Sequence, residues 1–317
     1  IKGTFNIMNL KLAKNIIFLT IITLNLSCSS QKVEESFEKT LIDIGDSLTA
    51  GAGGDGNNMS KTTSNLLGEE WVVKNMGVGG ENTLTIGARQ GGIPMYIKES
   101  IIIPGDGSQV QISSGLFSSY NDQEIHPLLQ GSAGVNPCYI DSVECKLTIN
   151  QGKYHINRIT PNSTDYKTEP KSTLFTALSK ETKGIATIFI GQNGGYKSPD
   201  DFLNQVDLLV RHKGDEHIII ITSHGNGNSR TVQPLKNKYG NKLIDLKEYM
   251  STEAIYDAIK FNLLPDNGKY PTTEDLERMG KNNAPKTLLK DGIHFNSIGY
   301  ELLGRLRYEK GKELGYW

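Results

Sequence analysis

Five short, mostly apolar runs recur along the chain, and each has the length of a strand and is rich in β-branched residues. Nearly continuous apolar runs of this kind are typical of strands buried on both faces of a parallel sheet. The five runs are residues 40–45, 69–78, 184–193, 216–225 and 241–250. We therefore predict a five-stranded parallel sheet.

Helical patterns alternate with these runs. Segment 198–212 opens with Ser198-Pro199 and two acidic residues, which make a favourable N-cap and first turn. Further helices are predicted over 251–262 and 296–314, and 171–181 also has a helical pattern. Strand and helix in alternation predict an α/β sandwich with crossover helices.

Residues 96–170 break this rhythm, because turn residues are frequent there and the apolar runs are short and alternating. This pattern predicts a β-rich subdomain inserted into an α/β domain that consists of residues 40–95 and 171–317. The insertion would act either as a substrate-binding module or as a loop-rich cap. Its sequence does not decide between the two.

Residues 1–28 have the pattern of an export signal. Lys11 and Lys14 precede an apolar run that ends shortly before Cys28 and is too short to cross a bilayer comfortably. A cysteine directly after such a run resembles the lipidation site of a bacterial lipoprotein, although Asn25 stands where an aliphatic residue is usual. An uncleaved membrane anchor and an ordinary signal peptide are the alternatives. The residues before Met8 are interpreted as upstream translation.

We therefore expect a protein that is exported and lipid-anchored through Cys28 in the bacterial cell envelope, in the periplasm or at the cell surface. Polar residues 29–39 would form a tether. An oxidising compartment would allow Cys138 and Cys145 to close a small disulfide loop, and two unpaired buried thiols are the alternative. No cluster of histidines or acidic residues accompanies the two cysteines, so a zinc site is not expected.

The balance of positive and negative charge bears on whether the protein binds nucleic acid. The 317 residues hold 34 Lys and Arg against 35 Asp and Glu, which gives a net charge of -1. A protein that neutralises nucleic-acid phosphates needs an excess of positive charge, so we expect no nucleic-acid partner.

Small and polar residues follow three of the predicted strands, and a fourth such segment precedes the last helix. In open α/β sheets, the carboxyl edge of the strands is where ligands bind. The four segments are Gly45-Asp46-Ser47-Leu48, NMGVGGENT (75–83), GQNGG (191–195) and DGIHFN (291–296). Each one alone has an ordinary explanation as a turn. Together they contain every group that nucleophilic catalysis by a serine requires.

Ser47 is a poor nucleophile unless a base takes its proton, and the usual base is a histidine that a carboxylate orients. Asp291 and His294 are three residues apart, so one loop can present both. The oxyanion formed in acyl transfer needs hydrogen-bond donors. The candidates are the Ser47 amide, the Gly80 amide and the side-chain amide of Asn193.

In these four segments the chain resembles the SGNH, or GDSL, hydrolases, and the segments occur in the family order. The resemblance implies a three-layer α/β/α sandwich around a five-stranded parallel sheet. It also implies that Ser47 is the nucleophile, His294 the base and Asp291 its orienting carboxylate, with Gly80 and Asn193 completing the oxyanion hole beside the Ser47 amide.

The chain departs from the family pattern in two places. Gly194 stands where an aspartate commonly follows the asparagine, and the β-rich insertion makes the separation between Gly80 and Asn193 long. No GxSxG motif is present, which argues against the larger α/β-hydrolase family.

The resemblance implies hydrolysis of an ester through an acyl-serine intermediate, without a metal or another cofactor. We expect a carbohydrate O-acetylesterase, because the chain has an export signal, a β-rich insertion and no large apolar lid. A lipase or thioesterase acting on longer acyl chains is the alternative, followed by a non-catalytic glycan-binding lipoprotein.

Three further residues are candidate substrate contacts. Arg89 and Gln90 follow the second segment closely, and His224 ends the fourth predicted strand. Structural roles, a salt bridge for Arg89 and a loop hydrogen bond for His224, are the competing interpretations.

Overall fold

The computed structural model describes residues 39–130, 134–214, 216–225 and 228–317. The predicted export signal, nearly all of the tether and the expected lipidation site Cys28 lie outside these residues. In the part of the chain that is described, no helix has the length and apolar character needed to cross a membrane.

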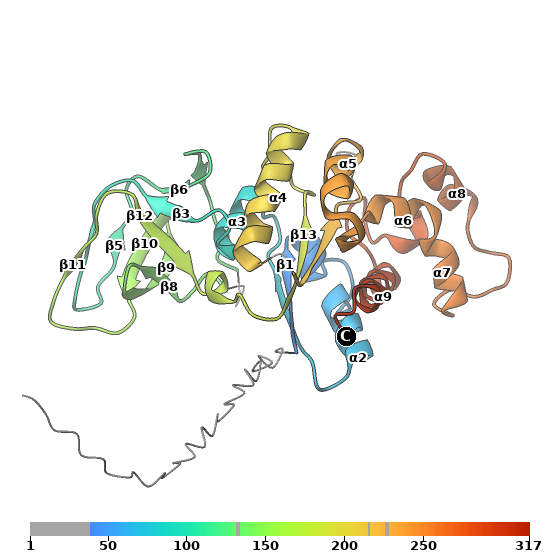
Figure 1. Ribbon diagram of the computed structural model, residues 1–317, viewed down its shortest axis with the longest axis horizontal. Coiled ribbons are helices and arrows are strands. Elements are labelled where there is room, and N and C mark those ends of the chain that lie inside the picture. Colours follow the sequence, from blue (N-terminus) through green and yellow to red (C-terminus); the bar gives the residue numbers. More distant parts are fainter. Residues whose placement is uncertain (1–38, 131–133, 215, 226–227) are drawn as a thin grey trace, which may run out of the picture. The chain divides into compact units, whose positions relative to one another are not determined.

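A five-stranded sheet, sheet A, lies at the centre of the α/β part of the chain (Figure 1). Its strand order is β15-β14-β13-β1-β2, and every neighbouring pair is parallel. This confirms the predicted parallel sheet. The strands are β1 (Thr40–Gly45), β2 (Val72–Gly77), β13 (Ile185–Ile190), β14 (Ile218–Thr222) and β15 (Leu243–Ile244).

Alternate residues of the central strands point to opposite faces of sheet A, and helices bury both sets. Ile188 and Ile220 pack into one cluster, and Phe189 and Ile221 pack into another. The helices that contribute to the first cluster are α3 (Thr83–Gln90), α4 (Pro199–Lys213) and α5 (Asn228–Tyr239). Those of the second are α1 (Ser47–Ala50), α2 (Met59–Leu67), α6 (Leu246–Thr252), α7 (Ala254–Lys260) and α9 (Ser297–Glu313).

The predicted helices over 198–212 and 296–314 are confirmed as α4 and α9, whereas 251–262 is divided between the end of α6 and α7. The fifth predicted strand is too long. Asp245 caps α6 by accepting a hydrogen bond from the Glu248 amide, and this cap ends the strand at Ile244. The remaining helix is α8 (Thr273–Met279), and short 3-10 turns are found at Leu178–Lys180, Gly240–Lys242 and Lys286–Leu288.

An eight-stranded antiparallel sheet, sheet B, is formed between Met95 and Thr176 (Figure 1). Its order is β5-β10-β9-β8-β12-β3-β6-β7, and a separate pair joins β11 to β4. The strands are β3 (Met95–Ile97), β4 (Ile102–Ile103), β5 (Val110–Gln111), β6 (Leu116–Ser118), β7 (Glu124–Ile125), β8 (Cys138–Ile140), β9 (Val143–Asn150), β10 (Lys153–Arg158), β11 (Tyr166–Lys167) and β12 (Ser172–Thr176).

One expectation about this region is wrong, and for the two cysteines the structure has the alternative of unpaired buried thiols. The helical pattern over 171–181 is strand β12 followed by a 3-10 turn, because its alternate residues are buried between β3 and β8. Cys138 and Cys145 are opposite each other on β8 and β9, yet both are free thiols. The Cys138 thiol faces the Cys145 carbonyl at 3.4 Å instead of the other sulfur. Burial raises the pKa of Cys138 to about 12 and that of Cys145 to about 11.

A buried ion pair joins α9 to sheet A. Arg307 and Asp43 have side chains with no exposed surface, and Arg307 also donates to the Thr63 hydroxyl at 3.0 Å. Asp43 accepts a second hydrogen bond from Ser60 at 2.6 Å. These contacts satisfy the charges that burial would otherwise penalise.

We predict that Arg307→Met lowers the free energy of unfolding by about 3–5 kcal/mol, because it leaves the Asp43 carboxylate buried without its cation. Urea unfolding at neutral pH measures this loss. The control is Lys39→Met, which removes an exposed pair with Glu70 and should cost less than about 1 kcal/mol. Equal effects of the two variants would contradict the prediction.

Candidate active site

The end of β1 presents Ser47 at the carboxyl edge of sheet A. A Cβ on Gly45 would come within 2.4 Å of the Phe189 carbonyl oxygen, so only glycine fits where β1 ends. Asp46 then caps the short helix α1 by accepting a hydrogen bond from the Leu48 amide at 2.9 Å. Ser47 is the first residue of α1, and its side chain remains partly exposed.

His294 joins Ser47 to Asp291, as the sequence predicts. Its Nε2 lies 3.0 Å from Ser47 Oγ, and its Nδ1 lies 2.8 Å from Asp291 Oδ2. An ionised carboxylate only accepts hydrogen bonds, so Nδ1 carries the proton and Nε2 is free to accept from the Ser47 hydroxyl. This is the arrangement in which an imidazole can take the proton of a serine.

Asp291 is held in its charged form. Its Oδ1 accepts the backbone N–H groups of Ile293 and His294, each at 2.7 Å. The hydrogen bond from the His294 ring and these two amides lower the pKa of Asp291 well below its usual range. The carboxylate is therefore available to orient the imidazole across the range of pH in which proteins are normally studied.

His224 is buried behind the loop that carries Asp291 and His294 and contacts that loop. Its Nε2 lies 2.7 Å from the Ile293 carbonyl oxygen, and its ring packs against the Phe295 ring at a tilt of 41°, with centroids 4.7 Å apart. Burial lowers the pKa of His224, so the ring is neutral and donates to the carbonyl. The expectation that His224 contacts substrate is thus corrected to a structural role.

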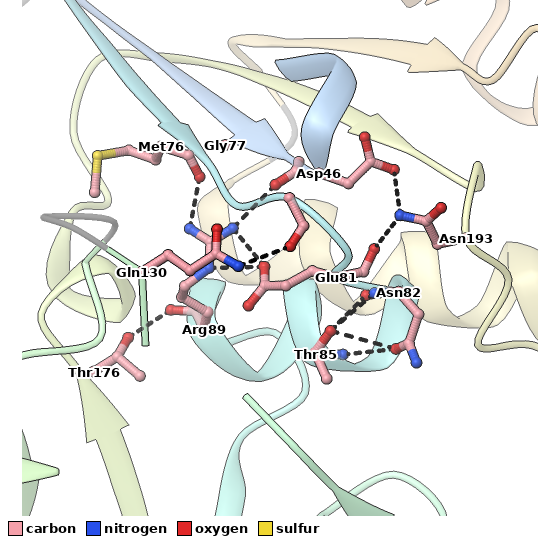
Figure 2. A network of polar contacts seen from close by, with 12 residues as sticks. Asp46, Met76, Gly77, Glu81, Asn82, Thr85, Arg89, Gln130, Thr176 and Asn193 are labelled. Carbon is pink, nitrogen blue, oxygen red and sulfur yellow. Dashed lines mark hydrogen bonds and ion pairs between the residues drawn. The ribbon is translucent and has the colours of Figure 1, made fainter. Parts of the chain in front are cut away.

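The two remaining predicted donors lie next to each other. Asn193 Nδ2 donates to the Glu81 carbonyl oxygen at 2.9 Å and to Asp46 Oδ2 at 3.4 Å (Figure 2). Glu81 directly follows Gly80, and Asp46 directly precedes Ser47. Gly80 has a φ of +85°, a conformation that glycine adopts without strain. The structure therefore gathers the loops of all five predicted residues at one edge of sheet A.

The side chains of Arg89 and Gln90 are buried, so a substrate cannot reach them. Arg89 is completely buried and pairs with Glu81 at 2.7 Å. Gln90 is 2 % exposed, and its amide donates to the Leu209 carbonyl oxygen at 3.1 Å. The structural interpretation of Arg89, a salt bridge, is therefore the observed one, and Gln90 is corrected from a candidate substrate contact to a structural residue, because the whole of α3 is buried.

Several residues of the site were not predicted from the sequence. Asp46 is 1 % exposed, and burial raises its pKa to about 6. Gln130, which follows β7, donates to the Gly79 carbonyl oxygen at 3.2 Å, and Leu128 lies against Gly80. No sequence signal marks Leu128 or Gln130, whereas the position of Asp46 directly before Ser47 was a signal that received no role.

Among the described residues, no three His, Cys, Asp or Glu side chains gather as ligands for a metal ion. Comparisons with protein-family models, with curated proteins and with solved structures found no match. The chemistry of the site is therefore argued from its own geometry.

We predict that Asp46 makes stability fall as pH rises. Its pKa is higher in the folded state than in the unfolded chain, so the folded state binds a proton more tightly between about pH 4 and pH 6. Asp46→Ser keeps an N-cap oxygen and removes the titration. The stability of the wild type relative to this variant should fall by about 2–3 kcal/mol between pH 4 and pH 7.5 in urea unfolding. A difference that does not change with pH would contradict this.

Proposed function

We propose that this protein is a serine esterase of the SGNH, or GDSL, type, with a three-layer α/β/α hydrolase domain interrupted by the insertion over residues 96–170. The observation that carries the proposal is the hydrogen-bonded chain Ser47–His294–Asp291, with separations of 3.0 and 2.8 Å. A serine, an imidazole and a carboxylate in this order form the arrangement that activates a serine for acyl transfer.

In the proposed reaction, Ser47 Oγ attacks the ester carbonyl carbon while His294 Nε2 takes the hydroxyl proton. Asp291 stabilises the imidazolium that results. The tetrahedral intermediate then collapses, the alcohol leaves with the proton from His294, and the acyl group remains on Ser47. A water molecule, activated by the same imidazole, hydrolyses the acyl-serine in the second half of the cycle.

The oxyanion would accept hydrogen bonds from the amides of Ser47 and Gly80 and from Asn193 Nδ2. Asn193 is exposed, so an incoming carbonyl can reach it. Its bond to Asp46 Oδ2 is long at 3.4 Å, whereas its bond to the Glu81 carbonyl oxygen is 2.9 Å. We propose that the oxyanion replaces the longer bond and that the shorter bond holds the amide in place.

We propose that the acyl group is small, because side chains that follow β7 lie beside the donor loop. A Cβ on Gly80 would lie 3.3 Å from Leu128 Cδ1, and one on Gly79 would lie 3.8 Å from both Gln130 Oε1 and Ser47 Cβ. The side chains of Leu128 and Gln130, which follow β7, therefore lie beside the donor loop. Together with the predicted export and anchoring at Cys28, this supports a carbohydrate O-acetylesterase in the cell envelope.

We predict that the protein hydrolyses p-nitrophenyl acetate, that the rate falls as the acyl chain lengthens, and that Ser47→Ala lowers kcat by at least about 10⁴-fold. The control is Ser163→Ala at an exposed position, which should retain full activity. A rate that rises with chain length would move the function to lipid or thioester substrates. Turnover that survives Ser47→Ala would contradict the proposal, and its complete absence in the wild type would favour a glycan-binding protein.

A further inference from the structure

One buried guanidinium connects two of the strand ends that precede the candidate oxyanion donors (Figure 2). Arg89, on α3, donates from Nε and Nη2 to Glu81 Oε2 at 2.9 and 2.7 Å. Its Nη1 donates to the Met76 carbonyl oxygen at 2.7 Å, and its Nη2 also donates to the Gly45 carbonyl oxygen at 3.1 Å. A single side chain thus contacts the ends of β1 and β2 and the loop that follows β2.

Two of these contacts are close in the sequence to a predicted donor. Gly45 is two residues before Ser47, and Glu81 directly follows Gly80. The main-chain oxygen of Glu81 accepts the amide of Asn193 at 2.9 Å. The path from Arg89 through Glu81 therefore reaches all three loops that would bind the oxyanion.

The ion pair of Arg89 and Glu81 can hold its neighbouring loops in a fixed position. Arg89 and Glu81 both have fully buried side chains, so solvent does not weaken their attraction. Burial raises the pKa of Glu81, and the guanidinium opposes that shift. The planar guanidinium presents several donors in a rigid fork, which a lysine ammonium cannot reproduce. The Arg89 carbonyl oxygen is itself bonded by Thr176 of β12, which anchors the end of α3.

We propose that Arg89 and Glu81 are positioning residues, which hold the loops of Ser47, Gly80 and Asn193 in one fixed arrangement for binding the oxyanion. The catalytic part of this inference rests on the proposed esterase function. A purely structural role is the alternative, because breaking any buried ion pair lowers stability.

The chain contains a matched control for that alternative. Arg307 and Asp43 form a second fully buried pair, whose guanidinium contacts Thr63, Thr187 and the Met59 carbonyl oxygen. None of these contacts is to the loops of Gly80 or Asn193. A lysine at either arginine position keeps the charge and loses the fork.

The experiment compares Arg89→Lys with Arg307→Lys in the full chain, under conditions where both remain folded. Hydrogen exchange is measured on peptides that cover residues 77–84 and 191–197, and kcat and KM are measured with p-nitrophenyl acetate. For Arg89→Lys we expect exchange at least about 10-fold faster in both peptides, and kcat lower by about 100-fold with KM within about 2-fold of the wild type. For Arg307→Lys we expect exchange in these peptides and kcat close to the wild-type values.

Unchanged exchange in both peptides of Arg89→Lys would overturn the inference, as would equal changes in the two variants. If Arg89→Lys does not fold, Glu81→Gln replaces it, with the same changes expected in the same direction. A wild type without Ser47-dependent turnover would remove the proposed function. The exchange measurement would then still decide whether Arg89 holds the loops, so the two failures are distinguishable.

Discussion

The parallel alignment of β1, β2 and β13 is the constraint on which the site depends. Gly45 at the end of β1 is paired with Gly77 on one side and with Phe189 on the other, so three strands end at the same level. Ser47, Gly80 and Asn193 follow these positions by two, three and four residues. Their loops lie close together because the strands end side by side. The loop that precedes α9 adds Asp291 and His294.

The sequence was sufficient to predict sheet A because strands buried on both faces form short apolar runs. Each observed strand lies within one of the five runs, although only the first run matches its strand from end to end. For residues 96–170 the sequence predicted β-rich structure but not the pairing of sheet B, which is set by contacts between distant segments. Residues 172–176 look helical by themselves, but β12 pairs with β3, which ends 75 residues earlier at Ile97, and with β8. Long-range pairing of this kind overrides local propensity.

The hydrogen-bonded chain of Ser47, His294 and Asp291 could be predicted because reactive side chains directly follow a predicted strand or directly precede a predicted helix. For Arg89 the sequence left two roles open, and the structure has the salt bridge, because its side chain turns inward to Glu81. The roles of Asp46 and Glu81 depend on their burial beside other polar groups, and no local sequence pattern shows that burial. Leu128 and Gln130 reach Gly79 and Gly80 only because the insertion folds back on the α/β domain.

We propose above that Ser47 is a nucleophile that His294 activates. Labelling with a fluorophosphonate, followed by intact mass and peptide mapping, tests it without any assumption about the natural ester. We expect one adduct on Ser47 in the wild type, none in Ser47→Ala, and labelling slower by at least about 100-fold in His294→Gln. Labelling of another residue, or equal labelling of Ser47 when His294 is replaced, would contradict it.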